Sequence, residues 1–138
     1  GNGAAVGAVL MKTEVSEKMS GKLYFNTFGG DPYQMAQAKL TMDIIREEKL
    51  VENAKVMGAK IRDALMQMMK KYPIIGDVRG RGLLLGAELV KDRNTKEHAS
   101  AEAIKFMDEC KERGLLLGKG GLQGNVIRIA PPINITAK

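Results

Sequence analysis

Apolar residues recur every three or four positions from Met35 to Met68, with one break near Glu48-Lys49. This spacing places them on one face of a helix and leaves charged residues on the other face. Pro73 ends the pattern, because its ring is incompatible with a helix interior. Residues 32–73 are therefore predicted to form connecting helices, whose methionines we interpret as core residues.

The residues before this region carry weaker signals. A short apolar run from Val6 to Met11 predicts a buried strand. Thr13 is the expected N-cap of a short helix that ends near Met19. Asp31 directly before Pro32 is typical of a helix start, with the aspartate as N-cap and the proline in the first turn.

After Ile74 the chain changes to short β-like runs separated by glycines. The pattern predicts either two strands or one long strand with a bulge at Gly80–Gly82. A helix opened by Ser100 and ended by Gly114 follows, and then two more strands. The expected strands are Val78–Gly80, Leu83–Val90, Leu115–Gly118 and Val126–Ala130.

This order of elements indicates an α+β fold, in which helices cover one face of a small antiparallel or mixed sheet. Three regions are predicted. They are residues 1–31, the connecting helices 32–73, and a small α+β domain over residues 74–138.

Composition excludes several classes of protein. Apolar residues make up 44% and charged residues 28% of the chain, the balance of an ordinary globular protein. No apolar run approaches the roughly 20 residues that cross a bilayer, so a membrane protein is not expected. The net charge of +6 is interleaved with acidic residues, which favours a solvated surface over a nucleic-acid partner. One cysteine and one histidine, Cys110 and His98, exclude a disulfide framework, a zinc site and a Cys-His catalytic pair.

The glycine-rich segment Gly118-Lys119-Gly120-Gly121 suggests a phosphate-binding loop, but its spacing is wrong. Such a loop needs a glycine five positions before the Gly-Lys pair and a serine or threonine after it. Arg113 and Gly120 occupy those two positions, and a strand follows in place of a helix. We therefore interpret the segment as a hairpin turn. Composition and spacing alone reveal no activity.

Three segments resemble those of one enzyme family, in the same order and at the same spacing. Phe25–Pro32 is similar to the F-x-T-[FY]-G-G-N-P segment of class III aminotransferases, which depend on pyridoxal phosphate. Ile75–Val90 resembles their G-x-[VI]-R-G-x-G-L segment. Gly114–Gly118 with Ile127–Pro132 resembles their closing segments. The stretches ELVKDRNTKE and GKGGLQGNVIRI look most like the mitochondrial type of alanine–glyoxylate aminotransferase.

The resemblance implies the C-terminal part of a fold type I aminotransferase, which is usually a homodimer. Residues 1–31 would be a remnant of the large cofactor-binding domain, and residues 74–138 the small C-terminal domain. The implied activity moves an amino group from alanine or an omega-amino acid to glyoxylate or pyruvate. The family's compartment is mitochondrial or cytoplasmic.

The same resemblance assigns roles to single residues. Gly1-Asn2-Gly3 is similar to the tail of the motif that carries the Schiff-base lysine, which would then lie before Gly1. No catalytic residue is therefore expected in this chain, which alone should be inactive and should not retain the cofactor. Thr27, with Asn26 beside it, matches the residue that binds the cofactor phosphate across the dimer interface. Arg128 matches the arginine that holds the substrate α-carboxylate, a role that its planar guanidinium suits.

Some positions depart from the family pattern, such as Asp31 in place of the usual asparagine before the proline. An alternative hypothesis also stays open. The self-contained α+β pattern after Ile74 is compatible with a stand-alone, non-catalytic dimerisation or interaction domain.

Overall fold

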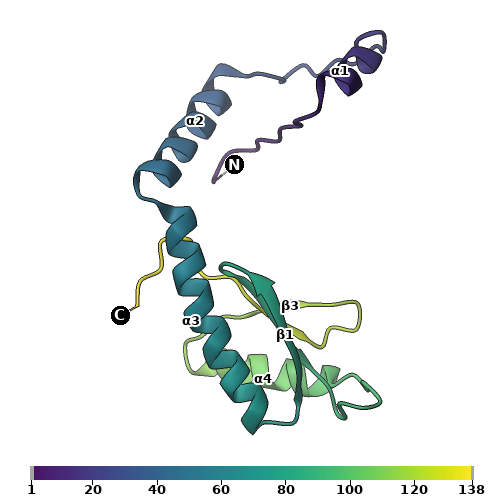
Figure 1. Ribbon diagram of the computed structural model, residues 1–138, viewed down its shortest axis with the longest axis vertical. Coiled ribbons are helices and arrows are strands. Elements are labelled where there is room, and N and C mark those ends of the chain that lie inside the picture. The colour runs from purple at the N-terminus through teal and green to yellow at the C-terminus, as the bar shows by residue number, and fades with distance from the viewer. Residues whose placement is uncertain (1, 138) are drawn as a thin grey trace. The chain divides into compact units, whose positions relative to one another are not determined.

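The computed structural model describes residues 2–137 and divides the chain into two compact units, Gly1–Glu48 and Lys49–Lys138 (Figure 1). We call them unit 1 and unit 2 and describe each by itself.

Unit 1 holds two helices, α1 over Thr13–Ser20 and α2 over Pro32–Glu47. The expected short helix is confirmed, but Thr13 is not its N-cap. Lys12 holds that position, without a side-chain hydrogen bond to the helix. The expected strand at Val6–Met11 is wrong, because this segment has no strand partner among the described residues. Val6 is half-buried, but the other apolar side chains of the segment are exposed, and Leu10 is 99% exposed.

The start of α2 follows the sequence prediction. Asp31 is the N-cap, and its carboxylate accepts hydrogen bonds from the backbone N–H of Tyr33 and Gln34, both at 3.1 Å. Pro32 occupies the first turn, where a missing N–H costs nothing. The break between the two long helices is also confirmed, because Lys49 adopts a left-handed φ of 53° between α2 and α3.

Unit 2 begins with α3, Leu50–Lys71, which ends ahead of Pro73 as predicted. Arg93 caps the C-terminal end of this helix. Its guanidinium donates hydrogen bonds to the carbonyls of Met69 and Tyr72, and also to those of Pro73 and Ile75 beyond the helix. The last carbonyls of a helix have no partner within it, so a distant arginine satisfies them here.

The sheet is antiparallel throughout, with strand order β1-β2-β4-β3. Of the two expected alternatives, the structure has two separate strands after α3. Gly82, with a φ of 54°, lies at the turn between them. Helix α4 opens at Ser100 as expected, and Gly114 follows it with a φ of 82°. The remaining bounds are β1 Ile75–Arg81, β2 Leu84–Leu89, α4 Ser100–Glu112, β3 Gly118–Gly120 and β4 Val126–Ile129.

Strand β3 lies later in the chain than predicted. The expected strand at Leu115–Gly118 is wrong apart from its last residue, because Gly118 is the first residue to pair with β4, opposite Arg128. Continuing this ladder backwards would place Leu116 opposite Ala130 and Leu115 opposite Pro131. Pro131 and the following Pro132 have no N–H to offer to a ladder. Leu115 is instead bound to the end of α4, through Cys110 O at 2.9 Å.

Both helices of unit 2 pack on the same face of the sheet (Figure 1). The core forms between Val78 and Ile127 on the strands and Ala103 on α4, with partly buried methionines from α3 and α4 around them. The predicted α+β fold with helices on one face is therefore confirmed. The opposite face of the sheet is covered by no helix among residues 49–137.

Candidate functional site

The segment Asn26–Gly30 forms a tight turn in unit 1, ahead of α2. The side-chain oxygen of Asn26 accepts from Phe28 N at 3.2 Å, and its backbone carbonyl accepts from Gly29 N at 2.9 Å. Asparagine is a residue that commonly shapes a turn in this way. Thr27 lies at the exposed tip, and its hydroxyl makes no hydrogen bond to another described residue. The turn therefore presents a free hydroxyl while Asn26 holds its shape.

The N-terminus of α2 is not open to an external anion. The N–H groups there would be natural phosphate donors, but the Asp31 carboxylate already accepts from Tyr33 and Gln34. A phosphate at this turn would rely on Thr27 and on groups from outside unit 1. The turn thus fits pyridoxal phosphate in part, as one hydroxyl donor for the phosphate.

Arg128 lies on the open face of the sheet in unit 2. The strand register places it in one row with Arg79 and Gly86 on one side and Gly118 on the other. The adjacent residue Ile127 points to the core face and is 3% exposed. The register of β4 therefore decides that Arg128 faces away from the helices.

No carboxylate of residues 2–137 forms an ion pair with Arg128. The two carboxylates nearest to Arg128 in the strand register, Asp77 and Glu88, both form ion pairs with Arg79. Arg79 Nη1 lies 2.7 Å from Asp77 Oδ2 and 2.5 Å from Glu88 Oε2. These hydrogen bonds, the one with Asp77 first, raise the pKa of Arg79 above its ordinary value. Arg79 is thus internally neutralised, whereas Arg128 has no ion-pair partner among the described residues.

A hollow of about 350 Å³ opens beside Arg128. Arg128 is the only charged residue in its lining, and the other side chains there are apolar. Such a hollow suits a small carboxylate with a short aliphatic part, because the cation binds the anion and the walls cover the rest. The lining residues are Leu115, Leu116, Leu117, Gly118, Arg128, Ile129, Ala130, Pro131 and Pro132.

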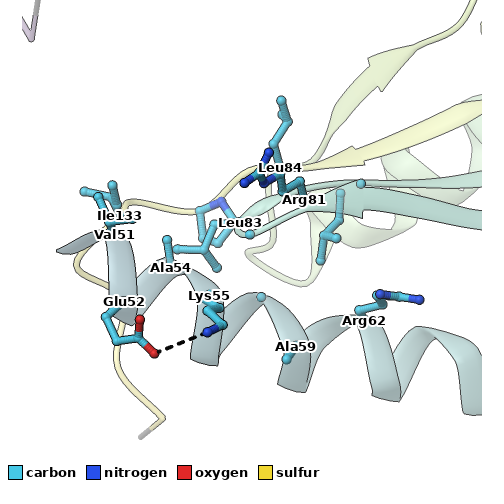
Figure 2. A pocket seen from close by; sticks show the side chains of 15 residues that line it. Val51, Glu52, Ala54, Lys55, Ala59, Arg62, Arg81, Leu83, Leu84 and Ile133 are labelled. Carbon is cyan, nitrogen blue, oxygen red and sulfur yellow. Dashed lines mark ion pairs between the residues drawn. The ribbon is translucent and has the colours of Figure 1, made fainter. Parts of the chain in front are cut away.

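A larger hollow, of about 670 Å³, lies elsewhere in unit 2, between α3 and the β1–β2 turn (Figure 2). Its floor contains Leu83 and Val51, and its charged residues include Glu52 and Lys55, whose Oε1 and Nζ are 3.9 Å apart. Neither of these charges is buried, and both lie on one turn of a solvated helix. We take the smaller hollow as the candidate site, because its single charged residue is Arg128, the arginine that the motif resemblance points to. The larger hollow instead mixes charges of both signs, since Arg62 and Arg81 line it together with Glu52 and Lys55.

The glycine-rich segment after α4 is no phosphate-binding loop. Gly118–Gly120 is the edge strand β3, and Gly121 and Gly124 form the turn into β4 with φ values of 78° and 66°. The predicted hairpin is present, but its turn lies later than predicted, because Gly118–Gly120 pairs with β4 as a strand. Residues 2–137 contain no group of three or more His, Cys, Asp or Glu side chains that would hold a metal ion. Within the same range, no helix is long and apolar enough to cross a membrane.

The structure places the predicted site residues in two units. Asn26 and Thr27 lie together in unit 1, and Arg128 lies in unit 2. Sequence reasoning missed the glycine opposite Arg128, Gly118, and the ion pairs of Arg79. The sequence indicated only that Gly118 ends a predicted strand and begins a glycine-rich segment, and without the register that pattern pointed to a turn.

A family model described as aminotransferase class-III matches residues 1–138. Alanine–glyoxylate aminotransferase 2 homolog 2, mitochondrial, of Arabidopsis thaliana is 47% identical over 136 residues, which cover 99% of this chain and 28% of the plant protein. Ethanolamine-phosphate phospho-lyase homolog 1 of Caenorhabditis elegans is 40% identical over 135 residues, 96% of this chain and 29% of the worm protein.

Solved structures agree with these relatives. A Bacillus anthracis aminotransferase superposes with a TM-score of 0.80 at 36% identity, over 91% of this chain and 30% of the bacterial one. An amine transaminase from an uncultivated Pseudomonas species, solved in its pyridoxal-phosphate-bound form, has a TM-score of 0.74 at 30% identity, over 85% and 26%. The chain thus spans less than a third of the length of each of these proteins.

Proposed function

This chain belongs to the class III aminotransferases, and from that premise we propose that it is the C-terminal part of an enzyme that moves an amino group from an amino acid to a 2-oxo acid. The proposed donor is alanine or an omega-amino acid, and the proposed acceptor is glyoxylate or pyruvate. The observation that carries the proposal is Arg128, an arginine beside an apolar hollow that has no carboxylate partner among the described residues.

Arg128 would hold the carboxylate that all these substrates share. A guanidinium offers two parallel N–H donors to a carboxylate, which fixes orientation as well as adding affinity. The half-buried apolar walls at Leu117 and Ile129 would cover part of this pair and so strengthen it. An orienting contact of this kind places the reacting carbon of the substrate, which is where its contribution to the rate arises.

Class III aminotransferases depend on pyridoxal phosphate, which when bound supplies the electron sink for chemistry at the carbon that carries the amino group. Thr27 would donate its hydroxyl hydrogen to a phosphate oxygen, and Asn26 would maintain the turn that presents it. We propose that this turn serves the site of the second subunit in a homodimer. Its exposed position and free hydroxyl support that role.

No lysine of this chain matches the family's cofactor lysine, and we propose that this lysine precedes Gly1 in a longer protein. The small share of the relatives' length that the chain spans supports this reading. The 138-residue chain is then expected to be inactive and to lose added pyridoxal phosphate on dialysis. A visible absorbance band of lysine-bound cofactor that survives dialysis of the chain would contradict the proposal.

The activity itself is tested in the extended enzyme, by which we mean the product of a coding sequence that includes the residues upstream of Gly1. We expect L-alanine and glyoxylate to give pyruvate and glycine. The R128A variant should lose about 100-fold in kcat/KM, as when one partner of a desolvated charge pair is removed. T27A should weaken the retention of pyridoxal phosphate and leave the KM for alanine within about twofold.

The similarity to a phospho-lyase suggests which reaction would contradict this proposal. Ethanolamine phosphate carries a phosphate in place of a carboxylate, and the Arg128 guanidinium would pair with either anion, so the products must distinguish the two reactions. Release of inorganic phosphate from ethanolamine phosphate, with no amino transfer from alanine or an omega-amino acid, would overturn the proposed reaction.

A second candidate function is a stand-alone, non-catalytic dimerisation or interaction domain. It is favoured by one observation, namely that unit 2 has a continuous core of its own, which includes Ile75, Val78 and Ile127. Gel filtration of the 138-residue chain distinguishes the two. A monodisperse dimer supports the second candidate, and a polydisperse aggregate supports a piece that lacks its large domain.

We propose a mitochondrial or cytoplasmic compartment for the extended enzyme. The mitochondrial Arabidopsis relative supports the first, and fractionation of the source cells with an antibody against this chain separates the two.

A further inference from the structure

Both cross-strand neighbours of Arg128 are glycines, Gly86 on β2 and Gly118 on β3. The two glycines differ in what fills the space above them. A Cβ built on Gly118 would lie 2.8 Å from Arg128 Nε, 3.1 Å from Nη2 and 3.3 Å from Cζ. A Cβ built on Gly86 would meet Val126 Cγ1 at 3.1 Å instead. The guanidinium of Arg128 therefore lies across β3, over the position where any other residue would place its side chain.

Backbone conformation does not explain a glycine at position 118. Gly118 lies within β3 and does not adopt a left-handed φ, unlike Gly121 in the turn that follows. Gly120, two positions along the same strand and on the same face, would place its Cβ no closer than 4.0 Å to Val126 Cβ. A side chain is thus accommodated at position 120 but collides with Arg128 at position 118.

The opposite side of Arg128 carries negative charge. Asp77 and Glu88 lie on the same open face, on the β2 side of β4, and Arg79 binds both. Gly118 lies on the β3 side, where the hollow beside Arg128 opens. By leaning over Gly118, Arg128 points into the hollow and away from the internal carboxylates.

We propose that Gly118 is a positioning residue for Arg128, because the absence of a side chain there lets the guanidinium lie over β3 and face the hollow. The inference rests on the proposed function, in which Arg128 holds the substrate carboxylate. A side chain at position 118 would turn the guanidinium out into solvent or back over Gly86 towards Glu88. In either case the substrate carboxylate would lose its aligned partner, while the cofactor turn at Thr27 is untouched.

The test compares G118A with the matched variant G120A in the extended enzyme, with L-alanine as the varied substrate. G118A should raise the KM for alanine between about tenfold and 100-fold, the range that a misplaced orienting contact can cost, with a smaller change in kcat. G120A should leave both parameters within about twofold. Equal losses in the two variants would mean that any side chain added to β3 disturbs the enzyme, whether or not it meets Arg128. That result would overturn the proposal.

A double-mutant cycle with R128A separates this inference from the proposed function. If Gly118 acts only through Arg128, G118A should change the KM by less than about twofold in the R128A background. The same loss in both backgrounds would overturn the positioning role and leave the role of Arg128 intact. An unchanged KM in R128A alone would overturn the carboxylate role of Arg128 and the positioning role with it.

Folding provides an independent check. G118A should fold, because the atoms that its Cβ would meet are the far end of the exposed, flexible Arg128 side chain, which moves aside at little cost. Its circular dichroism spectrum should therefore match that of the wild type. An unfolded G118A variant would show that Gly118 is required for another reason, which contradicts the proposal.

Discussion

Units 1 and 2 differ in what holds their functional residues in place. None of residues 2–48 is buried, and the large side chains Leu23, Tyr24 and Phe25 are each more than 80% exposed. Unit 2 contains the whole buried core, which includes Val90 at 1% and Ile127 at 3% exposure. The turn at Thr27 is therefore shaped by bonds between sequence neighbours, whereas Arg128 is oriented by strands that are distant in sequence.

This difference predicts how each half of the candidate site should respond to mutations. Local hydrogen bonds of the kind made by Asn26 and Asp31 can form without a core, and each contributes on the order of 1 kcal/mol. The row that contains Arg128 exists only when β2, β3 and β4 are in register. Damage to the core should therefore remove the Arg128 half of the site and spare the Thr27 half.

The largest effect is expected for I127A. This residue lies beside Arg128 on the core face, and truncating it should cost about 3 kcal/mol of the free energy of unfolding of unit 2. Urea denaturation followed by amide hydrogen exchange in β2 and β4 measures this loss. The control is L10A, at a 99% exposed position of unit 1, which should change stability by less than about 0.5 kcal/mol. Equal effects of the two variants would contradict the division into a unit with a core and one without.

The next largest effect is expected for R93A. The Arg93 guanidinium satisfies four backbone carbonyls at the end of α3 and beyond it, so its loss should cost about 2 kcal/mol in unit 2. R93K keeps the charge but not the planar fork, and should recover less than half of the loss. Unchanged protection of the amides of β1 in R93A would argue against this role.

In unit 1 a smaller effect is expected for D31A. Removal of the N-cap should destabilise the first turn of α2 by about 1 kcal/mol, and D31N should stay close to the wild type because its side-chain oxygen still caps the helix. Cα chemical shifts of the first turn of α2 report the change. A loss of signal from the sheet of unit 2 in D31A would contradict the local nature of this contact.

The smallest effect is expected from acid titration of α2. The hydrogen bond from Lys39, at 2.6 Å, lowers the pKa of Asp43 below its ordinary value. A depressed carboxyl pKa stabilises the helix above the unfolded pKa, and this contribution is lost as the pH falls through the folded pKa. Helical signal from α2 should therefore decrease slightly between about pH 5 and pH 2, and less so in D43N. An Asp43 titration midpoint at or above the ordinary value in carbon-detected NMR would contradict this contact.

Helices were the part of the fold that pattern reasoning predicted well. The start at Asp31, the break near Lys49 and the end before Pro73 all depend on residues whose effect is local, through a cap, a left-handed φ or a missing N–H. Strands were predicted less well. Val6–Met11 has the apolar character of a strand, but a strand also needs a partner, and none appears among the described residues.

The candidate site divides in the same way. The motif resemblance pointed to Thr27 and Arg128 without any knowledge of the register, and both roles stay predictions until the variants are measured. The finding that Asp31 already occupies the helix N-terminus could have been read from its strong capping position. The part that Gly118 plays beside Arg128 could not have been read in this way.

The sequence by itself was enough to specify the helix boundaries and the turn at Asn26, because each depends on residues close together in the chain. It also specified the family, because the order and spacing of three motifs can be read without a structure. Tertiary structure alone decided which face of the sheet Arg128 occupies, that Arg79 neutralises the nearest carboxylates, and that the space over Gly118 is filled by a guanidinium. The physical reason is that a strand's side chains alternate between faces, so a shift of one residue in the register would turn Arg128 into the core and Ile127 out of it.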